Sequence, residues 1–423
     1  MPPVVVFDGL LSLIQVAVTI VAFRLLPFAL YAALRMDGLP RSQVIVLMGL
    51  FVSAASATYL VNPGGMLPLL SSTMALGYFA CVGVAFHYVR RSRPADFGRQ
   101  AAVFLLAVTC YFAVPALAMP RWIAPLILLE GWELIFSSYS YAVDSPEIES
   151  SLGEGLFFLL VNPVLVFPMR GSAVPPGEQA RLPRAVGRVL QGAIVICAQG
   201  AVLSILSYCY ARGLLLKNLS EVDGAATYAR FIAYYVGQCL SLYAVHAGVA
   251  SIEIGCMAVL GYRIPERYAY PFAAATPLEF WSRWNTYLGD WLRRHVFFPV
   301  VMSFRRRRSK ATPATVMGVL AVFATIGILH AAVPLASQAR AGSASFVALT
   351  LVFVVHGTAL LVWEAIRRAT RERFARVGMD PRLRGVTLLG SWVLLRHLNA
   401  ILAWVAIPVM ARGTLPPELS RIW

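Results

Sequence analysis

The sequence is dominated by apolar runs of about 20 residues, which end at charges or prolines. An α-helix rises about 1.5 Å per residue, so a run of this length crosses the roughly 30 Å hydrocarbon core of a membrane. The runs lie near residues 4–34, 43–61, 66–89, 101–119, 121–143, 154–169, 186–212, 228–260, 314–335, 346–366 and 386–411. We therefore expect an all-α, polytopic transmembrane bundle of about 10–11 spans, forming a single domain over residues 1–423.

The composition excludes the classes that compete with this interpretation. Of the 423 residues, 59% are hydrophobic and only 13% are charged. This excludes a soluble globular enzyme, a disordered chain and a disulfide scaffold. The first apolar run has no basic region before it and no small-residue cleavage site, so we expect the chain to insert through its first helices.

The net charge of +16 is concentrated between the apolar runs. The clusters are Arg90, Arg91 and Arg93; Arg181, Arg184 and Arg188; Arg305 to Arg308 with Lys310; and Arg367, Arg368, Arg371, Arg373 and Arg376. Under the positive-inside rule these loops face the cytoplasm, so we expect membrane lipids and not nucleic acid as partners. Nearly every cation is arginine, which is typical of GC-rich bacterial genomes. We expect an integral, multi-pass protein of a bacterial plasma (inner) membrane.

Two regions depart from simple spans. The apolar segments 101–119, 121–143 and 154–169 lie between two basic loops that are both expected in the cytoplasm. An odd number of spans cannot connect two loops on the same side, so we expect one of the three to be re-entrant or interfacial. Prolines make the second and third segments the better candidates: Pro120, Pro125, Pro163 and Pro168.

The segment 268–304 is too charged to span a membrane and too aromatic for a plain loop. Thr276, Pro277 and Glu279 predict a helix start with a capping box. Apolar residues then follow at helical spacing: Leu278, Trp281, Leu288 and Leu292. The pattern predicts one amphipathic, Trp-rich helix, at the interface or packed across the bundle. Asn285 interrupts the apolar row, either because it bonds locally to backbone or water, or because it has a function.

His330 and His356 lie in runs with almost no other polar side chain. Ionisable groups inside apolar helices are costly, so each requires an explanation. For a single buried histidine, a hydrogen bond within the core is the favoured one. The histidines lack the paired spacing of a metal site, and the chain has neither a P-loop nor a GxSxG elbow.

The stretch PLEFWSRWNTYLGDWLRRHVFFPV, followed by GILH and VVHG, resembles the signature of the membrane-bound O-acyltransferase family. The similarity is to its bacterial alginate-acetylating and D-alanyl-transfer branches and covers residues of about 130–370. The matching residues are Phe280, Trp281, Arg283, Trp284, Asn285, Trp291, Leu292 and Arg293, with His330 as the counterpart of the catalytic histidine. His356-Gly357 and Glu364 resemble the next helix of the alginate-acetylating branch.

Two departures from the family pattern concern the residues beside His330 and the first site position. Leu329 and Ala331 stand where the family has tryptophan and glycine. Asn285 replaces a histidine common in bacterial polysaccharide acetylases. Asparagine is typical there of several eukaryotic branches, so this departure leaves the substrate open.

The resemblance implies transfer of an acetyl or longer acyl group to a hydroxyl acceptor, which could be a cell-surface glycan, a lipid or a metabolite. A neutral imidazole can take the hydroxyl proton, so His330 is the expected general base. Asn285 would stabilise the oxyanion or orient the acceptor. Substrate-binding residues would be His356, Trp281, Arg283 and Trp284. We expect no metal and no permanently bound cofactor, an acyl-CoA or acyl carrier protein thioester as donor, and export or biosynthetic proteins as partners.

Two other functions remain open. A proton-coupled transporter or flippase would use His330, His356 and Glu364 as a relay. A noncatalytic membrane subunit would explain the altered GILHA segment. The asparagine on a capped, Trp-rich amphipathic helix favours the acyltransferase, because a relay does not require it.

Overall fold

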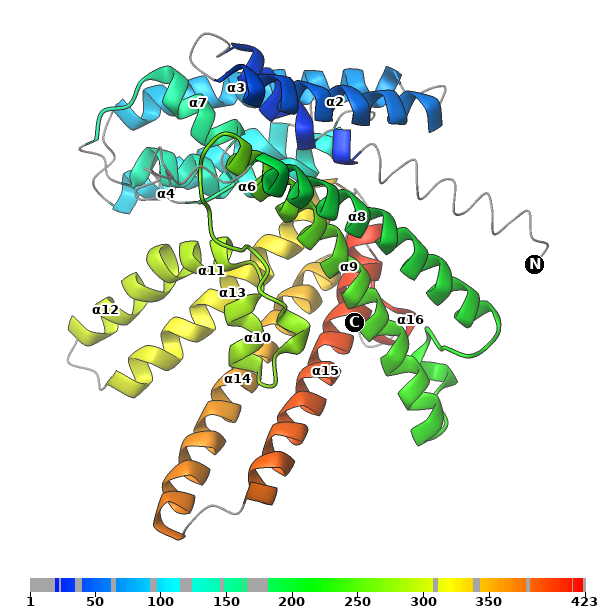
Figure 1. Cartoon of the computed structure of the whole chain (residues 1–423). Coiled ribbons are helices and arrows are strands. Elements are labelled where there is room, and N and C mark those ends of the chain that lie inside the picture. The colour runs from blue at the N-terminus through cyan, green and yellow to red at the C-terminus, as the bar shows by residue number, and fades with distance from the viewer. Residues whose placement is uncertain are drawn as a thin grey trace. The chain divides into compact units, whose positions relative to one another are not determined.

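The part of the chain that the structure describes consists of helices joined by loops (Figure 1). The computed structural model describes residues 20–34 except 23, 40–61, 66–91, 97–114, 124–144, 148–165 except 162, 182–306, 311–337, 343–377, 381–412 and 414–420. No strand occurs within these ranges. The predicted all-α fold class is confirmed.

The described helices follow most of the predicted apolar runs, and residues 4–19 of the first run lie outside the described residues. The helices are α2 (Arg41–Val61), α3 (Met66–Arg91), α4 (Phe97–Val108), α6 (Ala124–Val143), α7 (Leu152–Leu160), α8 (Leu182–Ala211), α9 (Ala225–Val259), α10 (Pro277–Arg283), α11 (Thr286–Leu292), α12 (Phe298–Arg306), α13 (Ala311–Ser337), α14 (Ser343–Val377), α15 (Pro381–Arg412) and α16 (Pro417–Ser420). Short 3₁₀ and π elements are η1 (Thr109–Ala113), η2 (Leu219–Glu221), η3 (Pro271–Ala273) and η4 (Arg293–Phe297).

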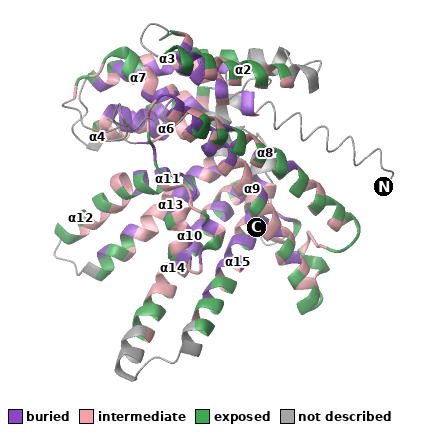
Figure 2. Cartoon of the chain, viewed as in Figure 1, coloured by how far each residue is buried: buried purple, intermediate pink, exposed green. Residues whose placement is uncertain are grey.

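Five described helices are long and apolar enough to cross a membrane. They are Leu182–Ala211, Ala225–Val259, Thr312–Ala332, Ser343–Thr370 and Gly385–Val409, and shorter apolar helices cover Ile20–Leu34 and Arg41–Ala57. Large apolar residues are exposed along several of them, as on α8, α14 and α15. Figure 2 shows exposed positions on the same helices. Such surfaces suit lipid rather than water. The chain is therefore an integral, multi-pass membrane protein.

Of the three segments between the basic loops, the third is too short to span. Helix α7 has 9 residues, which corresponds to about 14 Å. Its start is set by a capping box, in which the Ser151 hydroxyl accepts from the Glu154 N–H and the Glu154 carboxylate accepts from the Ser151 N–H. Because 14 Å is about half of the hydrocarbon core, α7 fits the expected re-entrant or interfacial segment.

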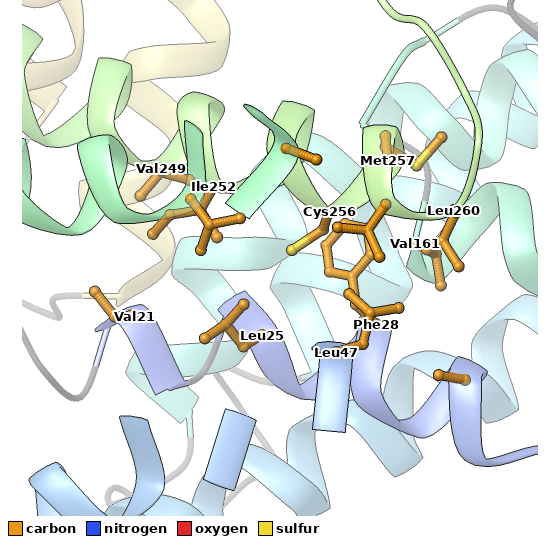
Figure 3. Close-up of a cluster of buried hydrophobic side chains, with 14 of the residues drawn as sticks. Val21, Leu25, Phe28, Leu47, Val161, Val249, Ile252, Cys256, Met257 and Leu260 are labelled. Atoms are coloured by element: carbon orange, nitrogen blue, oxygen red, sulfur yellow. The ribbon is translucent and has the colours of Figure 1, made fainter. Parts of the chain in front are cut away.

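The chain divides into two compact units. Unit 1 is Met1–Ser204 with Ser241–Glu266, and unit 2 is Ile205–Leu240 with Arg267–Trp423, so α8 and α9 contribute to both. In unit 1, apolar side chains such as Phe28, Ile252 and Met257 form a buried core (Figure 3). That the whole chain is a single domain stays a prediction.

In unit 2, glycines bring α13 and α14 into close contact. A Cβ on Gly327 would lie 2.8 Å from the Thr350 carbonyl oxygen, and one on Gly357 would lie 2.8 Å from the Phe323 ring. Small residues at such positions let helices pack closely in membranes. Since His330 lies one turn after Gly327 and His356 directly precedes Gly357, the two histidines are carried by one tightly packed helix pair.

The helix start predicted at Thr276 is present, but its reciprocal hydrogen bond is shifted by one residue. The Thr276 hydroxyl accepts from the Glu279 N–H at 3.2 Å. The Glu279 carboxylate accepts from the Ala275 N–H at 2.8 Å rather than from Thr276.

The single amphipathic helix predicted from Thr276 to beyond Leu292 is wrong. Helix α10 ends at Arg283, and α11 begins at Thr286. Between them Asn285 has φ 42° and ψ 66°, in the left-handed region. Asparagine tolerates this conformation better than most residues and is a favoured N-cap. The apolar row is thus divided between two short helices that are joined at Asn285.

Candidate active site

An aromatic cluster in unit 2 joins α10, α13 and α14. The Trp281 ring lies 5.2 Å from Phe323, 6.4 Å from Phe353 and 5.6 Å from His356, measured between centroids. The His330 ring lies 4.7 Å from Phe353. Three of the predicted site residues, Trp281, His330 and His356, are therefore brought together.

His330 is half-buried, and its tautomer is set by its own helix. Its Nδ1 lies 2.9 Å from the Ile326 carbonyl oxygen, one turn earlier. A carbonyl only accepts, so Nδ1 carries the proton in the neutral ring and the lone pair is on Nε2. Such an imidazole has the form that a general base requires.

His356 has the opposite tautomer and is 1% exposed. Its Nε2 donates to the Leu398 carbonyl of α15 at 3.0 Å, which places the lone pair on Nδ1. A hydrogen bond of this kind between two helices is what a structural histidine would make. Nδ1 is buried without a hydrogen-bond partner, and so is the Trp281 indole nitrogen. The cluster thus contains one acceptor and one donor whose hydrogen bonds remain to be made.

The side-chain oxygen of Asn285 has a structural role. Its Oδ1 accepts from the Leu288 N–H at 3.3 Å and from Arg267 Nε at 3.2 Å. The Arg267 carbonyl in turn accepts from the Thr286 N–H at 2.9 Å. The local-bonding explanation of Asn285 therefore describes its oxygen, and contact with a substrate would use Nδ2.

Arg283 and Trp284 make their contacts within the segment around α10. The Arg283 guanidinium lies 2.5 Å from the Glu279 carboxylate, and the Arg283 carbonyl accepts from the Ala269 N–H. Trp284 stacks on Phe280 with centroids 5.4 Å apart. These contacts hold the chain around Asn285 in place. A role of Arg283 and Trp284 in substrate binding stays a prediction.

The sequence analysis missed Arg267 and Arg396 of unit 2. Arg396 is 6% exposed within the apolar span Gly385–Val409. It donates to the Phe272 carbonyl, and its guanidinium lies 5.2 Å from the Phe272 ring. The two histidines were singled out because an ionisable group in an apolar helix is costly. The same criterion singles out Arg396 from the sequence.

No group of three or more potential metal-ligating side chains gathers within the ranges that the structure describes. The expected absence of a metal and of a permanent cofactor stays a prediction.

The chain is similar to three curated proteins, each called probable alginate O-acetylase AlgI. It is 25% identical to the Azotobacter vinelandii protein over 222 residues, which is 51% of this chain and 38% of that protein. It is 25% identical to the Pseudomonas aeruginosa protein over 166 residues, 38% of this chain and 28% of that protein. For Pseudomonas fluorescens the values are 24%, 161 residues, 37% and 28%.

The alignments thus cover between 28% and 38% of the length of these relatives. No protein-family model matches the chain. The resemblance to the membrane-bound O-acyltransferase family, inferred from the FW…RWN…WLR stretch and the histidine helices, is confirmed by relatives that carry the name of alginate O-acetylases.

Proposed function

We propose that the chain is a membrane-embedded O-acyltransferase. It moves an acetyl or longer acyl group from a thioester of coenzyme A or acyl carrier protein to a hydroxyl of a glycan, a lipid or a metabolite. The observation that carries the proposal is the His330 imidazole, whose Nδ1 is bonded to the Ile326 carbonyl and whose ring lies in a cluster with Trp281 and His356. The similarity to alginate O-acetylases supports the same reaction.

In this mechanism His330 Nε2 removes the proton from the acceptor hydroxyl as its oxygen attacks the thioester carbonyl. The C–O bond forms, the C–S bond breaks, and the departing thiolate takes the proton from the imidazolium. General base catalysis of this kind contributes about 10²–10⁴-fold. Asn285 Nδ2 would donate to the developing oxyanion, a contribution of about 10²–10³-fold.

The relay of a proton-coupled transporter is less well supported. Glu364 lies eight residues after His356 on α14, which is about 12 Å along the helix. Its carboxylate accepts from Arg367 Nη2 at 2.7 Å. A proton would need to cross this distance to reach a carboxylate that is already paired with an arginine.

The alternative function, a noncatalytic subunit, was based on the altered GILHA segment. Leu329 and Ala331 are both buried, whereas His330 between them is half-buried. Leu329 and Ala331 therefore lie at packing positions, and the base between them is retained.

The proposal includes a bacterial inner membrane as the location and export or biosynthetic proteins as partners. Its test uses the purified protein in lipid nanodiscs with labelled acetyl-CoA or long-chain acyl-CoA, and with lipid and glycan extracts as acceptors. We expect label in one extract, and its loss in His330→Gln. Proton-coupled flux in proteoliposomes without any acyl transfer would contradict the proposal.

A further inference from the structure

Arg396 is a buried cation with unfilled hydrogen-bonding capacity. A charged side chain at the centre of an apolar helix is costly, and proteins offset this cost by pairing the charge. Arg396 makes one hydrogen bond, to the Phe272 carbonyl, and its Nη1 is buried without a partner. No carboxylate of the described residues pairs with it. The described part of the protein thus supplies no counter-ion for this guanidinium.

A second unfilled donor lies three residues further along the same helix. Asn399 is 2% exposed, and its Nδ2 has no hydrogen-bond partner. Its backbone is anchored, since the Asn399 carbonyl accepts from the Cys239 thiol of α9 at 3.2 Å. Residues at i and i+3 share one face of a helix, so Arg396 and Asn399 lie on the same face of α15.

A chain of ring contacts links Arg396 to the aromatic cluster. The Phe272 ring, which the guanidinium covers, lies 5.9 Å from Phe280, and Phe280 lies 5.3 Å from Trp281. Trp281 contacts His356, whose Nε2 is held by the Leu398 carbonyl, between Arg396 and Asn399. The unfilled polar atoms of Arg396, Asn399, Trp281 and His356 are therefore contributed by elements that pack together in unit 2.

The chemistry of these atoms specifies the ligand. Arg396 Nη1, Asn399 Nδ2 and Trp281 Nε1 are donors, one of them cationic, and His356 Nδ1 is an acceptor. A guanidinium and an amide donor on one helix face fit the oxygens of a carboxylate or phosphate, and charge-assisted bonds to such anions are the strong ones. A neighbouring acceptor fits a hydroxyl of the same ligand.

We propose that Arg396 and Asn399, together with Trp281 and His356, bind the anionic oxygens of a substrate of this chain. The inference rests on the proposed function in one respect, the identity of the substrate that carries the anion. The anion is either a carboxylate of an acidic sugar acceptor or a phosphate of the coenzyme A donor. Both anions require the same donors, so measuring the binding of each one separately identifies which substrate carries the anion.

The test measures equilibrium binding to the purified full-length protein by calorimetry, with coenzyme A, an oligouronate and an uncharged glucan of equal length as probes. We expect one of the two anions to bind and the glucan not to bind. Arg396→Met should weaken anion binding at least tenfold. Arg396→Lys, which keeps the charge but loses the planar fork, should weaken it less. The matched control is Arg305→Met, an exposed arginine of α12, which should bind like the unmodified protein.

A thermal melt of each variant checks folding, and removing a buried cation that no described carboxylate pairs should leave Tm unchanged or raise it. Selective loss of coenzyme A binding assigns the phosphate, and selective loss of oligouronate binding assigns the carboxylate. Equal binding by Arg396→Met and the unmodified protein, or binding of neither anion by the unmodified protein, overturns the proposal. Binding does not require acyl transfer. If the unmodified protein binds the anion but transfers no acyl group, and Arg396→Met loses the binding, the acyltransferase proposal fails and the anion site stands.

Discussion

In unit 1, the partly buried Arg24 and the buried Arg90 are balanced by the protein's own groups. Arg24 donates to the Glu253 carboxylate at 3.0 Å, between residues 229 positions apart in sequence. Arg90, which is 4% exposed, donates to the backbone carbonyls of Tyr141, Asp144 and Ile148. In unit 2, Arg396 is buried about as well as Arg90, but among the described residues it donates only to the Phe272 carbonyl.

This difference in pairing indicates different roles for the arginines of the two units. Arg24 and Glu253 line a cavity of about 80 Å³ in unit 1, together with Glu133, Ser137 and apolar side chains. Opposite charges that neutralise one another inside a bundle stabilise the arrangement of its helices only while both are present. A cation whose donors are left unfilled is instead prepared for a ligand. We therefore expect substitutions in unit 1 to change folding, and matched substitutions in unit 2 to change binding and catalysis.

The largest effect should separate two histidines. His330→Ala should lower kcat by about 10²–10⁴-fold with little change in Tm, because it removes the base. His87 in unit 1 is buried, and its Nδ1 lies 2.8 Å from the Tyr141 hydroxyl. His87→Ala should lower Tm and leave kcat per folded molecule unchanged. Kinetics and thermal melts on the same preparations test both, and transfer near the unmodified rate in His330→Ala would remove His330 from the mechanism.

The next effect compares two arginines. Arg24→Met leaves Glu253 buried without its arginine and should lower the free energy of unfolding by about 3–5 kcal/mol. Arg24→Met with Glu253→Leu should recover part of that loss, since the double variant no longer buries the carboxylate that Arg24 neutralised. Arg396→Met should be neutral or stabilising. Denaturant unfolding in detergent measures all three, and a loss in Arg396→Met as large as in Arg24→Met would end the distinction between the units.

A third prediction separates the two roles of Asn285. Asn285→Asp keeps an oxygen for the Leu288 N–H and for Arg267, and aspartate also tolerates a left-handed conformation. It lacks the amide donor, so kcat should fall about 10²-fold at unchanged Tm. Asn285→Gly keeps the backbone free of strain but loses the cap, so it should lower both. An Asp variant with full activity would restrict Asn285 to the structural role. We also expect Asn285→His to retain more activity than Asn285→Ala.

The smallest effect concerns the glycines. Gly357→Ala places a methyl group 2.8 Å from the Phe323 ring and should lower the free energy of unfolding by about 1–3 kcal/mol. Gly49→Ala on α2 in unit 1 is the matched control, since nothing lies within 4 Å of its Cβ position. It should be neutral or stabilising by about 0.5–1 kcal/mol. Equal melting temperatures for the two variants would show that close packing of α13 and α14 does not depend on Gly357.

The sequence by itself determined where the helices lie, because a 20-residue apolar run and a capped start are local properties. The predicted runs 43–61, 186–212 and 228–260 correspond to α2, α8 and α9 within a few residues. The fold class and the family resemblance followed from such patterns. Gathering of Trp281, His330 and His356 was anticipated only through the family motif, because helical periodicity does not specify which helices become neighbours.

Tertiary structure alone decided the break at Asn285. The apolar spacing from Trp281 to Leu288 continues through this residue, so periodicity predicts one helix there. Asn285 adopts φ 42° where its oxygen accepts from Arg267, eighteen residues earlier. A bond between separate segments can stabilise a left-handed residue that local propensity disfavours.

Tertiary structure also decided which charges are paired. Arg24 and Arg396 are alike in sequence, since each is an isolated cation in an apolar run. Only the fold brings Glu253 to Arg24, and only the fold buries Arg396 against the Phe272 ring with no carboxylate of the described residues beside it. The physical reason is that the free energy of a buried charge depends on the few groups within about 4 Å of it, and these come from distant parts of the chain.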